Sequence, residues 1–119
     1  MTDVSVHVSG GAGVVAAELS GEITSTTATG LYEQLEPLVA AQGRLRLDLS
    51  KVTYISSAGL RVLVLLHRRA QQAQAAVELT GLTEELRFVM SATGFLDLFD
   101  VAPTTAEARA ADKLHREAA

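Results

Sequence analysis

Two adjacent serines, Ser56 and Ser57, stand where a polar stretch gives way to the apolar segment 60–66. A serine hydroxyl in such a place has three common uses: as a nucleophile, as a helix cap or as the acceptor of a phosphate. The nucleophile of a hydrolase elbow has glycines two residues before and two residues after it. The position two before Ser57 holds Ile55, so this hydrolase pattern is absent.

A nucleophilic Ser57 also needs a histidine and a carboxylate within hydrogen-bonding reach. The three histidines, His7, His67 and His115, are dispersed along the chain, and nothing brings one of them near Ser57. The same dispersion makes a poor metal site. Glu22 and the other carboxylates form no evident acid–base pair. The sequence therefore predicts a protein that is not an enzyme and that carries no metal and no cofactor.

Two uses of Ser57 remain open. As the N-cap of a helix that begins near Ala58, its hydroxyl accepts a hydrogen bond from the N–H of Gly59 or Leu60, which contributes about 1 kcal/mol. As a phosphate acceptor, it places the phosphate against the free N–H groups of the first helical turn, and the helix dipole favours that charge. We expect any phosphate on Ser57 rather than on Ser56, because Ser57 is the better candidate for the N-cap.

The composition limits the classes of partner and location. A chain of 119 residues is one domain by the usual prior. A formal net charge of -4 argues against a nucleic-acid partner, and no cysteine is present for a disulfide. The most apolar stretch, Leu60–Leu66, contains Arg61 and is far shorter than the roughly 20 residues of a membrane span. The first residues, MTDVSV, lack the basic start and apolar run of a signal peptide. These features predict a cytoplasmic protein without membrane insertion.

The elements that must position the serines follow from hydrophobic periodicity and from cap and turn residues. We predict strands over 4–8, 14–19, 44–50 and 76–79, a strand or turn over 95–101, and helices over 26–41, 58–73 and 83–92 with a last one from Thr104. Thr26 or Thr27 and Thr83 are expected caps, and Pro37 is expected to kink or end the first helix. A hairpin followed by alternating strands and helices indicates an α/β fold. Its sheet is mostly parallel with one antiparallel edge strand, and about four helices pack on it. Ser57 then lies in a loop after a strand, where sites in this class form.

The run DLSKVTYISSAGLRVLVLL resembles the central block of STAS domains, a family named for sulfate transporters and anti-sigma-factor antagonists. Bacterial single-domain members have Asp-Ser-Ser/Thr/Ala-Gly-Leu after an apolar strand, and GEIT at 21–24 resembles the Gly-Glu-Leu/Ile-Asp of the family. Ser56 and Thr24 stand where these patterns often have Asp. The resemblance covers the chain and implies a single STAS domain over 1–119.

The resemblance implies a partner-switching role as an anti-sigma-factor antagonist, or anti-anti-sigma factor. The first serine of the motif, which is Ser57 here, is the phosphorylated one, and Ser56 is the runner-up. The implied partners are an anti-sigma factor that is also a serine kinase of the histidine-kinase-like ATPase type, and a serine phosphatase. The implied partner-binding residues are Glu22, Thr24, Ser56, Ser57, Ala58, Gly59 and Arg61.

Two other roles of STAS domains remain open. One is a STAS subunit that braces the ATPase of an ABC lipid-transport complex. The other is a stand-alone domain that senses a small ligand.

Overall fold

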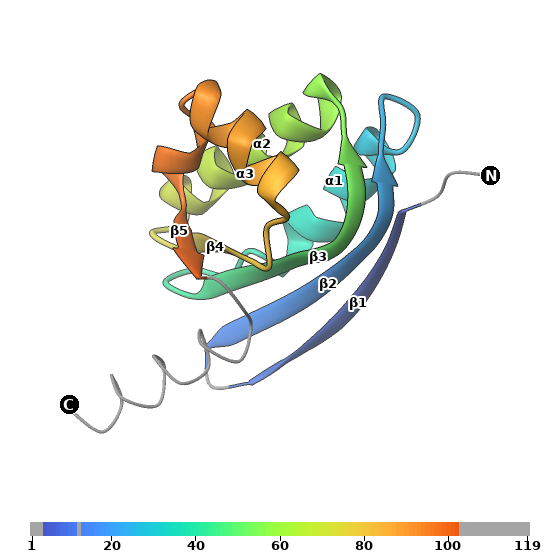
Figure 1. Cartoon of the computed structure of the whole chain (residues 1–119). Coiled ribbons are helices and arrows are strands. Elements are labelled where there is room, and N and C mark those ends of the chain that lie inside the picture. The colour runs from blue at the N-terminus through green and yellow to red at the C-terminus, as the bar shows by residue number, and fades with distance from the viewer. Residues whose placement is uncertain (1–3, 12, 103–119) are drawn as a thin grey trace.

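The structure is a computed structural model that describes residues 4–11 and 13–102 (Figure 1). Its strands are β1 (Val4–Gly11), β2 (Val14–Ile23), β3 (Arg44–Ile55), β4 (Ala76–Thr80) and β5 (Asp100–Ala102). Its helices are α1 (Ala28–Leu35), α2 (Ser57–Gln72) and α3 (Glu84–Ala92), with short 3-10 helices η1 (Glu36–Leu38) and η2 (Phe95–Leu98). The fourth helix predicted from Thr104 lies outside the described residues. No helix within 4–11 and 13–102 has the length and apolar character to cross a membrane.

The five strands form one sheet in chain order, β1-β2-β3-β4-β5. The hairpin pair β1–β2 is antiparallel and the other three pairs are parallel. This confirms the predicted mostly parallel sheet with one antiparallel edge strand. All three α-helices lie on the same side of the curved sheet (Figure 1). Because β2 and β3 are parallel, their carboxyl ends point the same way and meet at one edge of the sheet.

Strand β3 runs to Ile55, five residues beyond the predicted end at Ser50. Its pairing with β2 shifts between Glu18 and Ser20 and again between Gly21 and Glu22, so β3 gains residues relative to its neighbour. Such bulges change which residues face the core. Leu45, Leu47 and Leu49 are buried, but the next buried residues are Val52 and Ile55. The prediction ended early because the two-residue alternation stops there.

The core lies between the sheet and its helical layer. Leucines 45, 47 and 49 of β3 pack with the buried face of α2, to which Leu60, Leu63 and Leu66 belong. One side of α2 lies outside this core. Ser57, Arg61 and Arg68 are exposed there. Helix α2 is thus amphipathic, and it presents a solvent-facing stripe that begins at Ser57.

Local signals set most helix ends as predicted. Helix α1 ends at Leu35, and Pro37 follows within η1. Thr83 caps α3 by accepting a hydrogen bond from the N–H of Leu86 at 3.2 Å. Gly94, with φ of 79°, permits the left-handed turn after α3. The predicted threonine cap of α1 is wrong in one respect: Thr27 holds the N-cap position but makes no side-chain cap bond.

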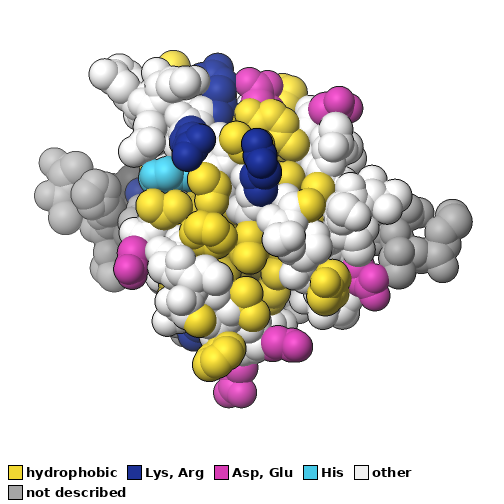
Figure 2. All heavy atoms as spheres, turned by 90° about the horizontal axis from the view of Figure 1, so that it is seen from above, with side chains coloured by type: hydrophobic (Ala, Val, Ile, Leu, Met, Phe, Trp, Pro, Cys, Tyr) yellow, Lys and Arg dark blue, Asp and Glu magenta, His cyan; other side chains and the backbone are white. Residues whose placement is uncertain are grey.

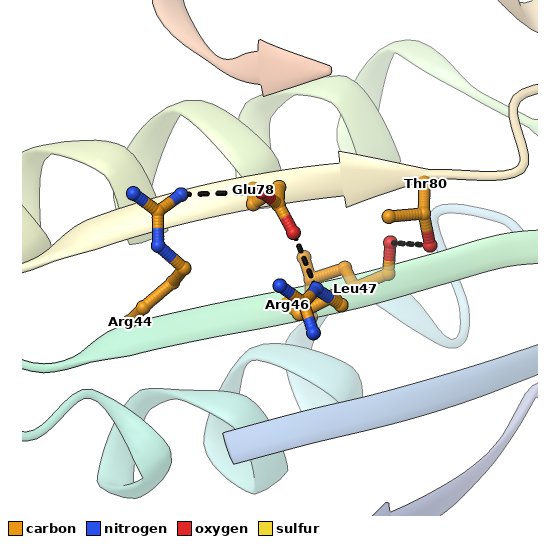
Figure 3. Close-up of polar contacts among 5 residues, drawn as sticks. All are labelled: Arg44, Arg46, Leu47, Glu78 and Thr80. Atoms are coloured by element: carbon orange, nitrogen blue, oxygen red, sulfur yellow. Dashed lines mark hydrogen bonds and ion pairs between the residues drawn. The ribbon is translucent and has the colours of Figure 1, made fainter. Parts of the chain in front are cut away.

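The sheet face opposite the helices carries a cluster of charged side chains (Figure 3). Glu78 on β4 accepts hydrogen bonds from Arg44, at 3.2 Å, and from Arg46, both on β3. Arg46 is only 2% exposed, and the Glu78 carboxylate stabilises its buried charge. An exposed pair joins Lys51 to Glu18 at 2.8 Å, and this hydrogen bond to Glu18 raises the pKa of Lys51. Arg46 is thus buried although it lies on the sheet face opposite the leucines of β3.

Candidate functional site

The carboxyl ends of β2 and β3 bring the predicted partner-binding residues together. Ile23 pairs with Ile55 at the last position of the two strands, and Glu22 pairs with Tyr54. The N–H of Ser56 donates to the carbonyl of Ile23 at 2.8 Å, which extends this pairing into the start of α2. We call the set that gathers here the Ser57 surface. Its members are Glu22, Thr24, Ser56, Ser57, Ala58 and Arg61, whereas Gly59, predicted with them, is buried.

Ser56 is the N-cap of α2, which corrects the assignment of that place to Ser57. Its backbone is extended, with φ of -86° and ψ of 173°. Its Oγ accepts a hydrogen bond from the N–H of Gly59 at 3.2 Å, and its carbonyl accepts one from Leu60 at 3.0 Å. The pairing of Ser56 with Ile23 explains the difference, because it makes Ser56 the last extended residue. The sequence could not show at which of the two adjacent serines the extended backbone of the strand ends.

Ser57 is the first residue of α2 and is exposed. Within the described part of the chain its hydroxyl has no hydrogen-bond partner, whereas that of Ser56 is engaged in the cap. The N–H groups of Gly59 and Leu60, one of which was expected to bond the hydroxyl of Ser57 as a cap, are both bonded to Ser56. Ser57 and Ala58 occupy the first two helical positions, whose N–H groups have no partner within the helix. Ser57 therefore offers an accessible hydroxyl that the fold does not use.

Gly59 sets how closely α2 approaches the two strands. A Cβ added at Gly59 would lie 2.6 Å from Cγ2 of Ile23 and 2.6 Å from Cγ1 of Ile55. Both isoleucines are buried. Real Cβ atoms do not come this close to other carbons, because interiors are tightly packed. The glycine is needed here to seat the helix start, and with it Ser57, against the ends of β2 and β3.

Thr24 has a structural role in the turn before α1. Its hydroxyl accepts from the N–H of Thr26 at 3.3 Å, and its N–H donates to Oγ1 of Thr27 at 2.9 Å. Oγ1 of Thr27 in turn donates to the carbonyl of Glu22 at 3.1 Å. This network fixes the loop that flanks the Ser57 surface. It also accounts for Thr27, whose hydroxyl is used in the turn rather than in a cap of α1.

Tyr54 belongs to this region although neither of the two motif blocks pointed to it as a binding residue. Its side chain is 52% exposed, and it is paired in register with Glu22. Tyrosine combines a large apolar surface with a hydrogen-bonding tip, and it is enriched at protein interfaces. An aromatic residue two positions before the Ser56–Ser57 pair was the available signal. Its exposure, however, depends on the shifted pairing of β3.

This region combines hydroxyl groups, one carboxylate, one guanidinium and an exposed tyrosine. Figure 2, which views the molecule from the top of Figure 1, shows hydrophobic side chains in the middle of this face, basic groups beside them and acidic groups mostly nearer the edge. His67 lies ten residues after Ser57 on α2, about 15 Å along the helix axis. Its ring contacts Phe99 edge-on, with a centroid distance of 5.6 Å. His7 is on β1, so neither of these histidines stands beside Ser57 as a catalytic base.

Comparisons with known proteins agree with this fold. The STAS domain family model matches residues 4–108. A protein of Bordetella bronchiseptica, BtrV, which is assigned as an anti-sigma factor antagonist, is 41% identical over 106 residues, covering 85% of this chain and 88% of its own length. The crystal structure of an anti-sigma factor antagonist from Mycobacterium paratuberculosis has a TM-score of 0.79 at 27% identity, covering 91% of this chain and 92% of that one. Unphosphorylated SpoIIAA shares the fold, with a TM-score of 0.72 at 15% identity over 93% of this chain and 96% of that one.

The protein belongs to the STAS domain family. This confirms the family resemblance of the two sequence blocks and the STAS fold that it implied. The relatives named above are anti-sigma factor antagonists, which are regulatory binding proteins rather than enzymes. That is the class of protein that the sequence predicted.

Proposed function

We propose that the protein is an anti-sigma factor antagonist whose binding is switched off by phosphorylation of Ser57. In this proposal the whole chain, 1–119, acts in the cytoplasm as a single STAS domain. Its partner is an anti-sigma factor that is also a serine kinase of the histidine-kinase-like ATPase type. Binding through the Ser57 surface frees a sigma factor, phosphorylation releases the antagonist, and a serine phosphatase restores it. The 41% identity to BtrV supports the antagonist role.

The observation that carries the choice of Ser57 is the contrast between the two serines. The hydroxyl of Ser56 is half-buried and accepts the cap hydrogen bond from Gly59. A phosphate on Ser56 would have to break or rearrange that cap, which contributes about 1 kcal/mol. Ser57 is exposed and makes no such bond. A kinase can therefore modify Ser57 without disturbing the fold.

The effect of the phosphate follows from its charge. It adds roughly -1.5 to -2 at neutral pH, and docking of a partner would have to desolvate that charge. A loss of about 4 kcal/mol at the interface lowers affinity about a thousandfold, which is enough to change the partner. The solved structures of SpoIIAA include a phosphorylated form, with a TM-score of 0.67 to this chain, so the shared fold accommodates a covalent phosphate.

The direct test is site-resolved mass spectrometry after incubation with the anti-sigma factor kinase of the same organism and ATP. Wild type and Ser56→Ala should both carry phosphate on residue 57, and Ser57→Ala should carry none. Phosphate that persists in Ser57→Ala and disappears in Ser56→Ala reverses the assignment. Absence of phosphate from all three proteins, with a kinase that binds them, contradicts the switch.

A binding measurement tests the consequence of the charge. Ser57→Ala should bind the anti-sigma factor about as tightly as wild type, because the unmodified surface remains. Ser57→Asp should bind more weakly. Gln72→Glu is the matched control, since it adds one negative charge at the exposed far end of the same helix. Equal affinities of Ser57→Asp and Gln72→Glu would show that charge at Ser57 is not the switch.

A further inference from the structure

The exposed stripe of α2 places an arginine one helical turn from Ser57. Ser57 and Arg61 are both exposed and are separated by four residues on the same helix. Side chains at this spacing are neighbours, with Cβ atoms about 6 Å apart. The stripe continues through the partly exposed Val64 and Leu65 to the exposed Arg68. Arg61 is therefore the first cation on the stripe that begins at Ser57.

Few backbone N–H groups in the first turn of α2 are free to bind an anion, so a nearby cation can add to them. Because Ser56 occupies the N–H groups of Gly59 and Leu60, only those of Ser57 and Ala58 remain for an anion on this turn. The first turn of α2 holds no acidic residue. Among residues 4–11 and 13–102, Arg61 makes no ion pair and no side-chain hydrogen bond, whereas Arg44, Arg46 and Arg69 are paired with glutamates.

The order of the two residues also suits an ion pair. An anion four residues before a cation is the favourable arrangement on a helix. The planar guanidinium presents several donors and binds phosphate oxygens in pairs. Glu22, on strand β2, is the acidic member of the Ser57 surface, and it forms no ion pair with Arg61 among the described residues. A phosphate carries up to twice the charge of that carboxylate and has three acceptor oxygens, so it is the stronger partner.

We propose that Arg61 pairs in cis with the phosphate on Ser57 and holds it against the start of α2. This inference rests on the proposed phosphorylation of Ser57, but it concerns the modified protein and not the kinase. The pair keeps the phosphate on its own helix and uses the guanidinium that the unmodified protein presents to a partner. Phosphorylation thus adds a negative charge to the Ser57 surface and also removes a free positive one.

The test uses the full chain with phosphoserine incorporated at position 57 by genetic encoding, so no kinase is required. Phosphorus NMR follows the second ionisation of the phosphate, which lies near pH 6 in general. The acid dissociation constant should be about two- to fivefold larger in wild type than in Arg61→Gln, as for an exposed ion pair. Arg68→Gln, with its change two turns further along the stripe, should match wild type. The difference should shrink in about 1 M salt, where the screening length is about 3 Å.

Each outcome is informative. A wild-type midpoint below that of Arg61→Gln and equal to that of Arg68→Gln supports the pair. Equal midpoints in all three proteins overturn it. An equal shift in both arginine variants means that the phosphate responds to net charge and not to Arg61, which also overturns it. Because the phosphate is installed directly, failure here leaves the kinase test of Ser57 unaffected, and failure of the kinase test leaves this measurement valid.

Discussion

Replacing Gly59 by alanine tests how the fold seats Ser57. Alanine normally stabilises a helix relative to glycine, by up to about 1 kcal/mol. At Gly59 the added methyl group would lie 2.6 Å from carbon atoms of both Ile23 and Ile55. Gly30 is the matched control, because it holds the same third position of its helix, α1. A Cβ at Gly30 would meet no atom within 4 Å.

The contacts with Ile23 and Ile55 decide whether Gly59→Ala stabilises or destabilises the protein. Ile23 is 0% exposed and Ile55 is 9% exposed, and β-branched side chains have few alternative rotamers. Overpacking at such a site costs about 1–3 kcal/mol. After the helix-propensity gain is subtracted, Gly59→Ala should lose about 1–2 kcal/mol of unfolding free energy. Gly30→Ala should gain about 0.5–1 kcal/mol, because only the propensity changes.

The assay is urea unfolding at 25 °C followed by far-ultraviolet circular dichroism, since the chain has no tryptophan. Similar m-values show that both variants unfold from the same kind of state. The two substitutions should differ by about 1.5–3 kcal/mol, with opposite signs. If Gly59→Ala is as stabilising as Gly30→Ala, the start of α2 is not packed against the two isoleucines. The seating of Ser57 then needs another explanation.

Three more stability predictions use the same unfolding assay. Ser56→Ala should lose about 1 kcal/mol because it removes the cap bond to α2, and Ser57→Ala should change stability little; the reverse order would return the cap to Ser57. Leu63→Ala should lower the unfolding free energy by about 2–5 kcal/mol because Leu63 is 1% exposed. Leu65→Ala should lower it less, because Leu65 is partly exposed. Glu78→Ala should cost about 3 kcal/mol or more because it removes the carboxylate that pairs with the buried Arg46; a loss below about 1 kcal/mol would mean that this pair is not stabilising.

The sequence by itself determined the order of elements and most helix ends, because local chemistry sets both. Thr83 caps α3 and Pro37 follows the end of α1, as predicted, and Gly94 takes the positive φ that follows α3. The alternation of strands and helices after a hairpin was enough for the mostly parallel sheet. The two motif blocks were enough for the STAS family, since their residues are adjacent in the sequence.

The tertiary structure decided the details of the site. The shifted pairing with β2 carries β3 on to Ile55, so that Tyr54 is exposed and Ser56 forms the last hydrogen bond of the strand pair. That bond makes Ser56 the cap and leaves Ser57 free, a one-residue difference that no local preference between two serines could fix. The close approach of Ile23 and Ile55 to Gly59 likewise joins residues from two strands and a helix. Register and contact between distant segments are properties of the packed sheet, because they depend on pairing across strands and not on the order of residues along one of them.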